Sequence, residues 1–421
     1  MNTLWLAPVF LVLTLLRQNI ILTLAVLVGM IHVYVASHSS IEYLVQDLWF
    51  TLDRELLLSI PMFIFAGVIM SRGSIASRLV RIMTALTAPL PGGLGVGTIL
   101  AMAVFSSISG SAIVTMMAVG SLMYPALTKA GYGVRYSLGV LASCGTLGVI
   151  IPPSLLMILY GISTDVSVTE MFKAGWGPGL LMVGLMSAYT LVVNRHLPAG
   201  QFHLAELLSA IRHGVSAMLM PVILLGGIYS GYFTVTEAAA VSLAYALVVE
   251  VLIHRELGVR EIYEIGIETI KLLGSLMPLV AIAGSLNVIL DYEGVPQALV
   301  RFFQIYLDNS WEMLVAVNLL LLIAGALMDE GSAIIILAPL LAPIGVSYGY
   351  DPVHFAIIVI VNLQLGYVVP PVAINLIIAA TVFKQSFRTA CMAVVPFIAI
   401  MLVVLLLVIL FPQLSLFYVG R

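Results

Sequence analysis

Polar side chains interrupt two long apolar segments of this 421-residue chain. They are Ser106, Ser107, Ser109 and Ser111 in the first segment, and Asp329, Glu330 and Ser332 in the second. Hydroxyl and carboxylate oxygens are ligands for hard cations such as Na⁺. Where a helix breaks, one half offers free carbonyls that suit a cation, and the next offers free N–H groups that suit an anion. The two interruptions therefore predict ion and substrate sites.

The two interruptions belong to an internal repeat. Gly110-Ser111-Ala112-Ile113 recurs as Gly331-Ser332-Ala333-Ile334, and Pro152-Pro153 recurs as Pro370-Pro371. An offset of 217 to 221 residues also relates Pro61 to Pro278, Pro125 to Pro343 and Gly148 to Gly366. In a membrane chain, two halves that each carry a broken apolar segment are typical of a transporter whose site lies between the repeats.

Composition places the chain in a lipid bilayer. Hydrophobic residues make up 62% of the sequence and charged residues 9%, with a mean hydropathy of +1.16. We expect an all-α polytopic membrane protein with spans at 4–16, 20–36, 56–72, 134–162, 168–193, 215–232, 234–253, 274–290, 352–384 and 388–411. Residues 4–16 read as a permanent span, because they lack a charged leader and a small-residue cleavage site. The chain has no basic cluster to bind nucleic acid. Cys144 and Cys391 are expected to be buried small hydrophobes.

The interrupted segments, 92–125 and 312–346, are predicted to be re-entrant hairpins. Each arm has roughly 15 residues, or about 22 Å of helix, which is short for a ~30 Å hydrocarbon core. Amphipathic stretches between the spans are expected to lie at the membrane interface as helices. These stretches are 38–55, 74–88, 200–213, 256–272 and 295–309.

Charge supports this topology. With both hairpins re-entrant, only Arg54, Lys173, Arg301 and Arg421 of the 17 Lys and Arg residues fall on one face. By the positive-inside rule that face points away from the cytoplasm, and both termini lie on it. Five crossings separate the starts of the two repeats, so the repeats are predicted to be inverted.

Each hairpin needs a facing partner, and the proline pairs predict one. Proline removes an N–H and disfavours helix in the preceding residue, so spans 134–162 and 352–384 should break near Pro152-Pro153 and Pro370-Pro371 and restart there. Ser154 and Asn375 follow the two breaks and could offer polar groups to a cavity.

The acids at the second interruption allow two interpretations. A carboxylate inside an apolar hairpin suggests a function, for which Asp329 is the better candidate. Alternatively, one of the two acids caps the helix that follows. Glu237, after Thr234, fits a helix cap.

At these residues the chain resembles the large membrane subunit of tripartite ATP-independent periplasmic (TRAP) transporters, over about residues 5–411. The most specific matches are Ser59-Ile60-Pro61-Met62-Phe63-Ile64-Phe65-Ala66-Gly67, Ile150-Ile151-Pro152-Pro153-Ser154 and Val369-Pro370-Pro371-Val372. The resemblance implies a Na⁺-coupled symporter with an elevator-type transport domain and a scaffold in the bacterial inner membrane. It also implies a small four-helix membrane subunit, a soluble periplasmic substrate-binding protein, and an organic-acid substrate such as a C4-dicarboxylate or a sialic acid. Na⁺ would be the coupling ion, with no other cofactor.

The resemblance and the polar patterns together predict one set of Na⁺ ligands and one set of substrate contacts. The Na⁺ ligands would come from Ser107, Ser109, Ser111, Gly145, Gly148, Asp329, Ser332 and Gly366. The substrate would contact Ser109, Gly110, Ser111, Pro153, Ser154, Ser332, Pro371 and Asn375. The transport domain would comprise 56–165 and 274–385, and the scaffold 1–55, 166–273 and 386–421.

The chain departs from the family at Arg17-Gln18-Asn19, where Gly and Pro are usual, and at Asp329-Glu330-Gly331, where a single acid is usual. The acid pair leaves Na⁺ and proton coupling both open. A partner-independent divalent-anion symporter of related fold is an alternative, although its Ser-Asn-Thr tips are absent here. An enzyme is disfavoured because no histidine accompanies Ser109-Gly110-Ser111 as a base. A channel is disfavoured because no ring of charged or aromatic pore residues is present.

Overall fold

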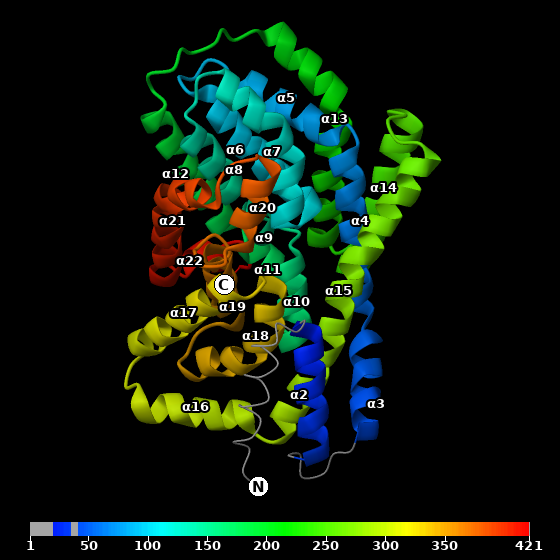
Figure 1. The fold of residues 1–421 in the computed structure, drawn as a ribbon, viewed down its shortest axis with the longest axis vertical. Helices are drawn as coiled ribbons and strands as arrows, with labels where there is room; N and C mark the ends of the chain where they lie inside the picture. Colours follow the sequence, from blue (N-terminus) through cyan, green and yellow to red (C-terminus); the bar gives the residue numbers. More distant parts are fainter. Residues whose placement is uncertain (1–19, 35–40, 421) are drawn as a thin grey trace.

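The protein is helical throughout the part that the structure, a computed structural model, describes: residues 20–34 and 41–420 (Figure 1). Nine helices in this part are long and apolar enough to cross a membrane, or ten if one bent pair counts as a single span. The prediction of an all-α polytopic membrane protein is therefore confirmed. The expected span 4–16 and the turn Arg17-Gln18-Asn19 lie outside the described residues.

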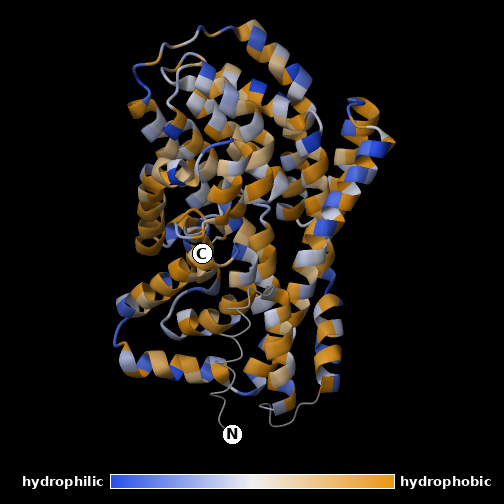
Figure 2. Cartoon of the chain, in the orientation of Figure 1, coloured by the Kyte–Doolittle hydropathy of each residue, from blue (hydrophilic) through white to orange (hydrophobic). Residues whose placement is uncertain are grey.

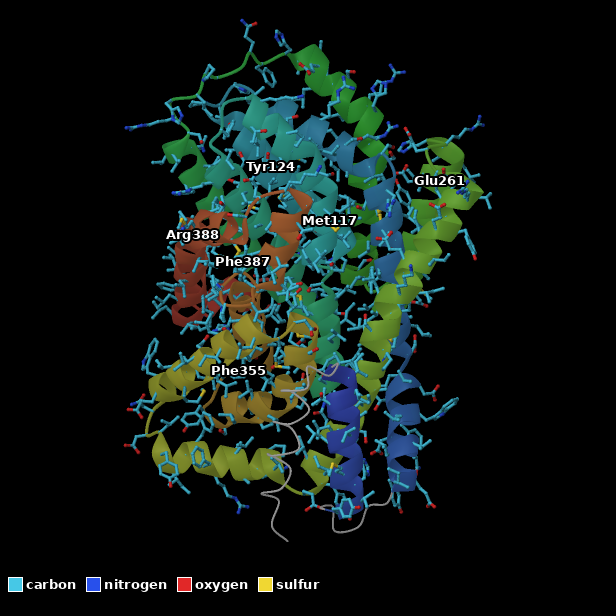
Figure 3. All side chains as sticks on the ribbon, viewed as in Figure 1. Met117, Tyr124, Glu261, Phe355, Phe387 and Arg388 are labelled. Carbon is cyan, nitrogen blue, oxygen red and sulfur yellow. The ribbon has the colours of Figure 1, made fainter. Side chains whose placement is uncertain are left out.

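The distribution of hydrophobic residues over the helices is the one expected for a protein in a lipid bilayer. Figure 2 shows hydrophobic residues along most of the helical surface, with hydrophilic residues gathered at helix ends and at the junction of α14 (Val235–Leu247) and α15 (Val259–Tyr292). Glu261 marks the end of α15 that projects from the body, whereas Phe355 of α19 (Pro352–Gly366) is buried (Figure 3).

The described part of the first half contains the expected spans from 20–36 onward, and a separate helix in each of the expected interfacial stretches 38–55 and 74–88. It comprises α2 (Ile20–Tyr34), α3 (Ile41–Leu52), the 3₁₀-helix η2 (Glu55–Leu58), α4 (Ser59–Arg72), α5 (Ile75–Thr87), α6 (Gly93–Ser109), α7 (Ala112–Lys129), α8 (Val134–Gly145), α9 (Leu147–Ile150), α10 (Leu155–Thr164), α11 (Val168–Ala174) and α12 (Trp176–Val193). The expected span 134–162 is broken into α8, α9 and α10, with a bend of 40°. The helix restarts after the proline pair, at Leu155, rather than at the pair itself.

The second half of the chain is also helical. It comprises α13 (Leu204–Tyr229), α14, the π-helix η3 (Val248–Ile253), α15, α16 (Val295–Tyr306), α17 (Ser310–Leu327), α18 (Glu330–Ser347), α19, α20 (Ile374–Val382), α21 (Phe387–Leu410) and α22 (Gln413–Leu416). The break between α19 and α20 contains the second proline pair, as expected.

Two predicted interfacial helices are not separate elements. Stretches 200–213 and 256–272 continue into the following spans as the N-terminal parts of α13, with 26 residues, and α15, with 34. A lone glycine followed by helix-forming apolar residues does not end a helix, and the chain stays helical through Gly214 and Gly274.

The hairpin arms are longer than the roughly 15 residues that we expected. α6 has 17 residues and α7, α17 and α18 have 18 each, because the helix continues through the serines and stops only at Gly110. Three of these arms are long enough to be candidate spans. Length alone therefore does not decide whether the hairpins are re-entrant.

Helix contacts link the two halves of the chain. α8 and α12 both contact α6 and α21, and α19 contacts α21 and α9. α4 contacts α14, α15, α6 and α7, while α2 and α3 pack on α15. α5 packs against α6 and α13, and α10 packs on α18.

Candidate functional site

The first interruption is a sharp turn built by Gly110. This residue ends α6 with φ +59°, a left-handed conformation that glycine adopts without strain, and its N–H donates to the Ser106 carbonyl (3.0 Å). Ser111 is extended and starts α7. The turn directs the last carbonyls of α6 and the first N–H groups of α7 to the same place.

Neighbouring glycines let the backbone surround this turn. A Cβ atom on Gly148 would lie 2.8 Å from the Ser111 carbonyl, and one on Gly67 would lie 3.2 Å from the Ser109 Cα. A Cβ on Gly145 would lie 3.1 Å from the Ala112 carbonyl. Gly145 and Gly148, both predicted from the sequence, therefore pack directly against the main chain of the tip. A side chain at either position would push the tip away.

Pro153 and Ser154 close the other side of the tip. The Leu155 N–H donates to the Gly110 carbonyl (3.3 Å), and a Cβ on Gly110 would lie 2.9 Å from the Pro153 carbonyl. Ser154 is buried and its hydroxyl accepts from the Met157 N–H (3.5 Å) as the N-cap of α10. The predicted Ser109, Gly110, Ser111, Pro153 and Ser154 are thus brought together.

The serine hydroxyls of the first tip are mostly engaged with the protein. Ser107 Oγ donates to the Val104 carbonyl (2.7 Å), and Ser109 Oγ pairs with Thr115 Oγ1 (2.7 Å). Ser106 Oγ is buried with no partner in the described part of the chain. Thr115 escaped the sequence analysis because a single threonine in an apolar helix carries no signal.

At the second interruption, Asp329 and Glu330 have different positions and different hydrogen-bond partners. Asp329 is the N-cap of α18: one carboxylate oxygen accepts from the Ser332 N–H (2.8 Å) and the other from the Ser332 hydroxyl (2.5 Å). Glu330 begins the helix, and its Oε2 atom is buried without a hydrogen-bond partner among the described residues. The capping interpretation therefore applies to Asp329, the acid that we favoured for function. Thr234 and Glu237 form the expected cap of α14.

The facing break in the second half lies close to the hairpin, but not at its tip. A Cβ on Gly366 would lie 2.8 Å from the Gly325 Cα, in the last turn of α17. Pro371 is exposed, whereas Pro153 is buried. Pro371 lines a cavity of about 370 Å³ with Ile377 and Thr381. The second tip is therefore less enclosed than the first.

Two buried amides join the broken spans to each other. Gln364 Nε2 donates to Thr146 Oγ1 (3.0 Å), and Asn375 Nδ2 donates to the Ala142 carbonyl (2.7 Å). Both side chains are fully buried, and their carbonyl oxygens have no partner in the described residues. Asn375, predicted as a substrate contact, thus reaches the first broken span. Gln364 and Thr146 were missed, although polar residues inside a broken apolar span were a usable signal.

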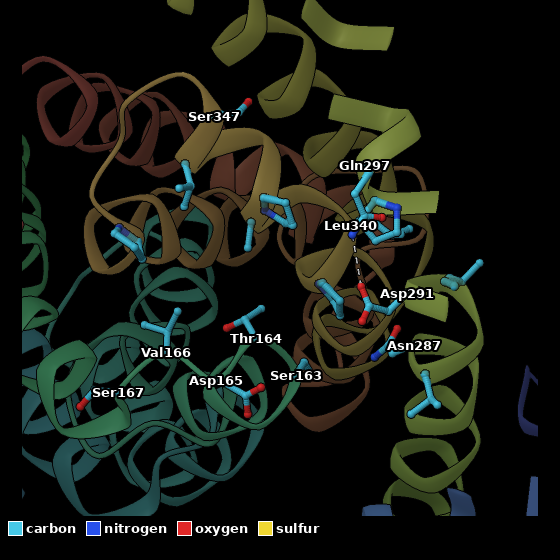
Figure 4. Close-up of a pocket in the computed structure, with 18 of the residues that line it drawn as sticks. Ser163, Thr164, Asp165, Val166, Ser167, Asn287, Asp291, Gln297, Leu340 and Ser347 are labelled. Atoms are coloured by element: carbon cyan, nitrogen blue, oxygen red, sulfur yellow. Dashed lines mark hydrogen bonds between the residues drawn. The ribbon is translucent and has the colours of Figure 1, made fainter. Parts of the chain in front are cut away.

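A larger cavity of about 880 Å³ lies away from both tips, between the ends of α10 and α15 (Figure 4). The starts of α16 and α19 and the C-terminal half of α18 also line it. It contains none of the predicted site residues that the structure describes. All its charged lining residues come from segments that the topology assigns to the periplasmic face.

An all-helical chain with many spans and two polar breaks that face each other has the architecture of a membrane transporter. The family model "Tripartite ATP-independent periplasmic transporter, DctM component" matches residues 8–414. The chain therefore belongs to the DctM family, the large permeases of TRAP transporters, and these are transporters rather than enzymes.

Relatives with named substrates agree with this assignment. The chain is 36% identical to the C4-dicarboxylate TRAP transporter large permease DctM of Pseudomonas aeruginosa, over 92% of each chain. It is 34% identical to the ectoine large permease TeaC of Halomonas elongata, over 89% of each chain. It is 35% identical to the isethionate permease DctMQ of Oleidesulfovibrio alaskensis, over 90% of this chain and 60% of that protein.

Among solved structures, the YdaH transporter of Alcanivorax borkumensis has a similar fold. Its TM-score is 0.62 at 14% identity, over 99% of this chain and 98% of that one. MtrF of Neisseria gonorrhoeae gives 0.52 at 14% identity, over 92% and 93%. At this identity the similarity establishes the fold alone.

Proposed function

We propose that the chain carries an organic carboxylate across the bacterial inner membrane in symport with Na⁺. The observation that supports this most directly is the first tip, where main chain from α6, α7 and the α8–α9 break converges around Gly110 and Ser111. Carbonyl and hydroxyl oxygens held this way suit Na⁺, and free N–H groups at the start of α7 suit a carboxylate.

The transport movement in this proposal is an elevator between inverted repeats with re-entrant hairpins. Helix contacts across the halves support it, since α10 packs on α18 and α20 packs on α7 in matching positions. The sequence placed α12 and α21 in the scaffold and α4 and α15 in the transport domain. Contacts of α4 with α6 and α7, and of α15 with α18, support the placement of α4 and α15.

The proposed partners are a small four-helix membrane subunit and a soluble periplasmic binding protein that delivers the substrate. Family membership supports partner subunits, and one relative bears the fused name DctMQ. Both termini are proposed to face the periplasm.

Thermal unfolding of the purified chain in NaCl and in choline chloride at equal ionic strength tests Na⁺ coupling. A ligand at 100 times its dissociation constant stabilises the folded state by about 2.7 kcal/mol. We expect a Na⁺-specific rise in melting temperature that is lost on mutation of Ser111 or Ser332. Equal melting temperatures in the two salts would contradict Na⁺ binding by this chain.

Proton coupling is a second candidate, and one observation favours it. The buried Glu330 oxygen without a partner is a group that a proton could neutralise, since an unpaired buried carboxylate is costly. In that case, uptake driven by a pH gradient would persist without Na⁺ and would be lost in Glu330→Gln.

A further inference from the structure

The 880 Å³ cavity carries a distinctive set of charges. Among the residues that line it, Arg54 is the only Lys or Arg, and Asp165, Glu170 and Asp291 are acidic. Figure 4 shows Asp165, Thr164 and Ser163 on one side of the cavity, and Asp291, Asn287 and Gln297 across from them. A ligand inside would meet one guanidinium and three carboxylates.

Arg54 is positioned for a carboxylate but is only partly engaged. Its Nη1 atom donates to the Ile162 carbonyl (2.5 Å) and to Asp165 Oδ1 (3.4 Å). The Nε and Nη2 atoms make no hydrogen bond in the described part of the chain, and 47% of the side chain is exposed. The free edge of a guanidinium binds one carboxylate through two parallel hydrogen bonds.

The acids determine what the rest of the ligand can be. Asp291 stands across the cavity from Asp165 and accepts a long hydrogen bond from Gln297 Nε2 (3.5 Å). A second carboxylate on the ligand would approach these groups with like charge, whereas a cationic group would find opposite charge. One such contact changes affinity by roughly tenfold at a partly solvated site.

We propose that this cavity is the vestibule that first receives the substrate, and that it selects a zwitterion with one carboxylate and one cationic group over a dicarboxylate. Arg54 binds the carboxylate, and Asp291 with Asp165 faces the cationic group. The proposal rests on the proposed function and narrows its substrate class.

The test is thermal unfolding of the purified full chain in NaCl, titrated with ectoine as a zwitterion and succinate as a dicarboxylate. We expect ectoine to raise the melting temperature with an apparent affinity at least ~10 times that of succinate. Arg54→Gln should abolish the ectoine shift and Arg54→Lys should weaken it. Arg301→Gln, an exposed arginine on the neighbouring α16 that does not line the cavity, should leave it unchanged.

A second variant distinguishes ligand recognition from a structural role of Arg54. Asp291→Asn removes one repulsive charge and keeps Arg54, so it should raise the apparent affinity for succinate several-fold. Succinate binding to the wild type as tightly as ectoine would overturn the proposal, as would no shift with either ligand. The Na⁺-specific shift without organic ligand tests the proposed function separately, because it does not depend on Arg54.

Discussion

At the scale of single residues, the adjacent carboxylates of Asp329 and Glu330 differ in their hydrogen bonding. Both carboxylate oxygens of Asp329 accept hydrogen bonds from Ser332, whereas Glu330 has a buried oxygen with no partner in the described chain. The difference follows from helix geometry, because the N-cap position places the Asp329 side chain beside the free N–H groups of the first turn. One acid therefore caps α18, and we propose that its neighbour takes part in binding the coupling ion.

This division predicts opposite phenotypes for two substitutions. Asp329→Ala should lower stability by about 1 kcal/mol, the usual cost of a lost N-cap, in NaCl and in choline chloride alike. Glu330→Gln should leave the melting temperature in choline chloride unchanged or higher and alter the response to Na⁺ or to pH. Thermal unfolding of both variants in both salts checks this, and a loss of the cation response in Asp329→Ala alone would reverse the assignment.

Gly148 gives a second prediction at this scale. A methyl group there would lie 2.8 Å from the Ser111 main chain, so Gly148→Ala must push the hairpin tip away. We expect a loss of about 1–3 kcal/mol, typical of overpacking, together with a weaker Na⁺ shift. Gly184→Ala in α12 is the matched control, because nothing lies within 4 Å of its added methyl. Equal melting temperatures for the two variants would mean that the tip does not pack on Gly148.

At the scale of elements, the junction between α4 and α5 depends on a carboxylate from a distant helix. Glu250 is fully buried in the π-helix η3, accepts from the Ile75 N–H (3.0 Å) and from Ser74 Oγ (3.3 Å), and lies 3.6 Å from His254 Nδ1. A Cβ on Gly73 would lie 2.3 Å from the Glu250 carboxyl carbon, so a side chain at position 73 would displace this carboxylate. This acid therefore reaches the N-terminus of α5 from a π-helix, an element that is rare in proteins.

Removal of this carboxylate should loosen the attachment of α5. Glu250→Ala leaves the Ile75 N–H without its acceptor, and a buried unsatisfied donor costs about 1–3 kcal/mol. Thermal unfolding should show this loss, and limited proteolysis should cut the Gly73–Ser74 turn faster. Glu264→Ala, in an exposed pair with Arg260, should change stability by less than about 0.5 kcal/mol. An equally small loss of stability in Glu250→Ala would show that Glu250 does not hold α5 in place.

At the scale of the whole molecule, long-range contacts join segments that the topology assigns to the same face. Arg54 meets Ile162 and Asp165 at the proposed periplasmic face. At the opposite face, Arg72 pairs with Glu268 (2.8 Å) and Arg78 donates to the His213 carbonyl (2.6 Å). This grouping fits the charge asymmetry that the positive-inside rule uses.

Labelling with a membrane-impermeant thiol reagent in intact cells tests the orientation. In a background that lacks Cys144 and Cys391, cysteines at Asp165 and Asp308 should react from outside, because both positions lie on the proposed periplasmic face. Cysteines at Lys271 and Arg388 should react only after the membrane is permeabilised. The reverse pattern would invert the topology and place the Arg54 cavity in the cytoplasm.

The sequence alone determined the helical membrane class, the two interruptions and the positions of the proline breaks. These features follow from local physics: apolar length specifies a span, glycine permits a left-handed turn, and proline removes an N–H. The same local reasoning failed for helix boundaries, because whether a helix ends or continues at a given residue depends on the helices packed around it. It separated 200–213 from 215–232 and 256–272 from 274–290, although each pair is one continuous helix, and it shortened the hairpin arms.

Only the tertiary structure decided which groups meet. The bonds from Gln364 to Thr146 and from Asn375 to Ala142 join residues 218 and 233 positions apart, and no local pattern specifies such a pair. The cap at Asp329, the reach of Glu250 to Ile75 and the cavity around Arg54 also depend on how helices pack. A side chain's type fixes what it can bind, but the packing of distant helices fixes what lies within its reach.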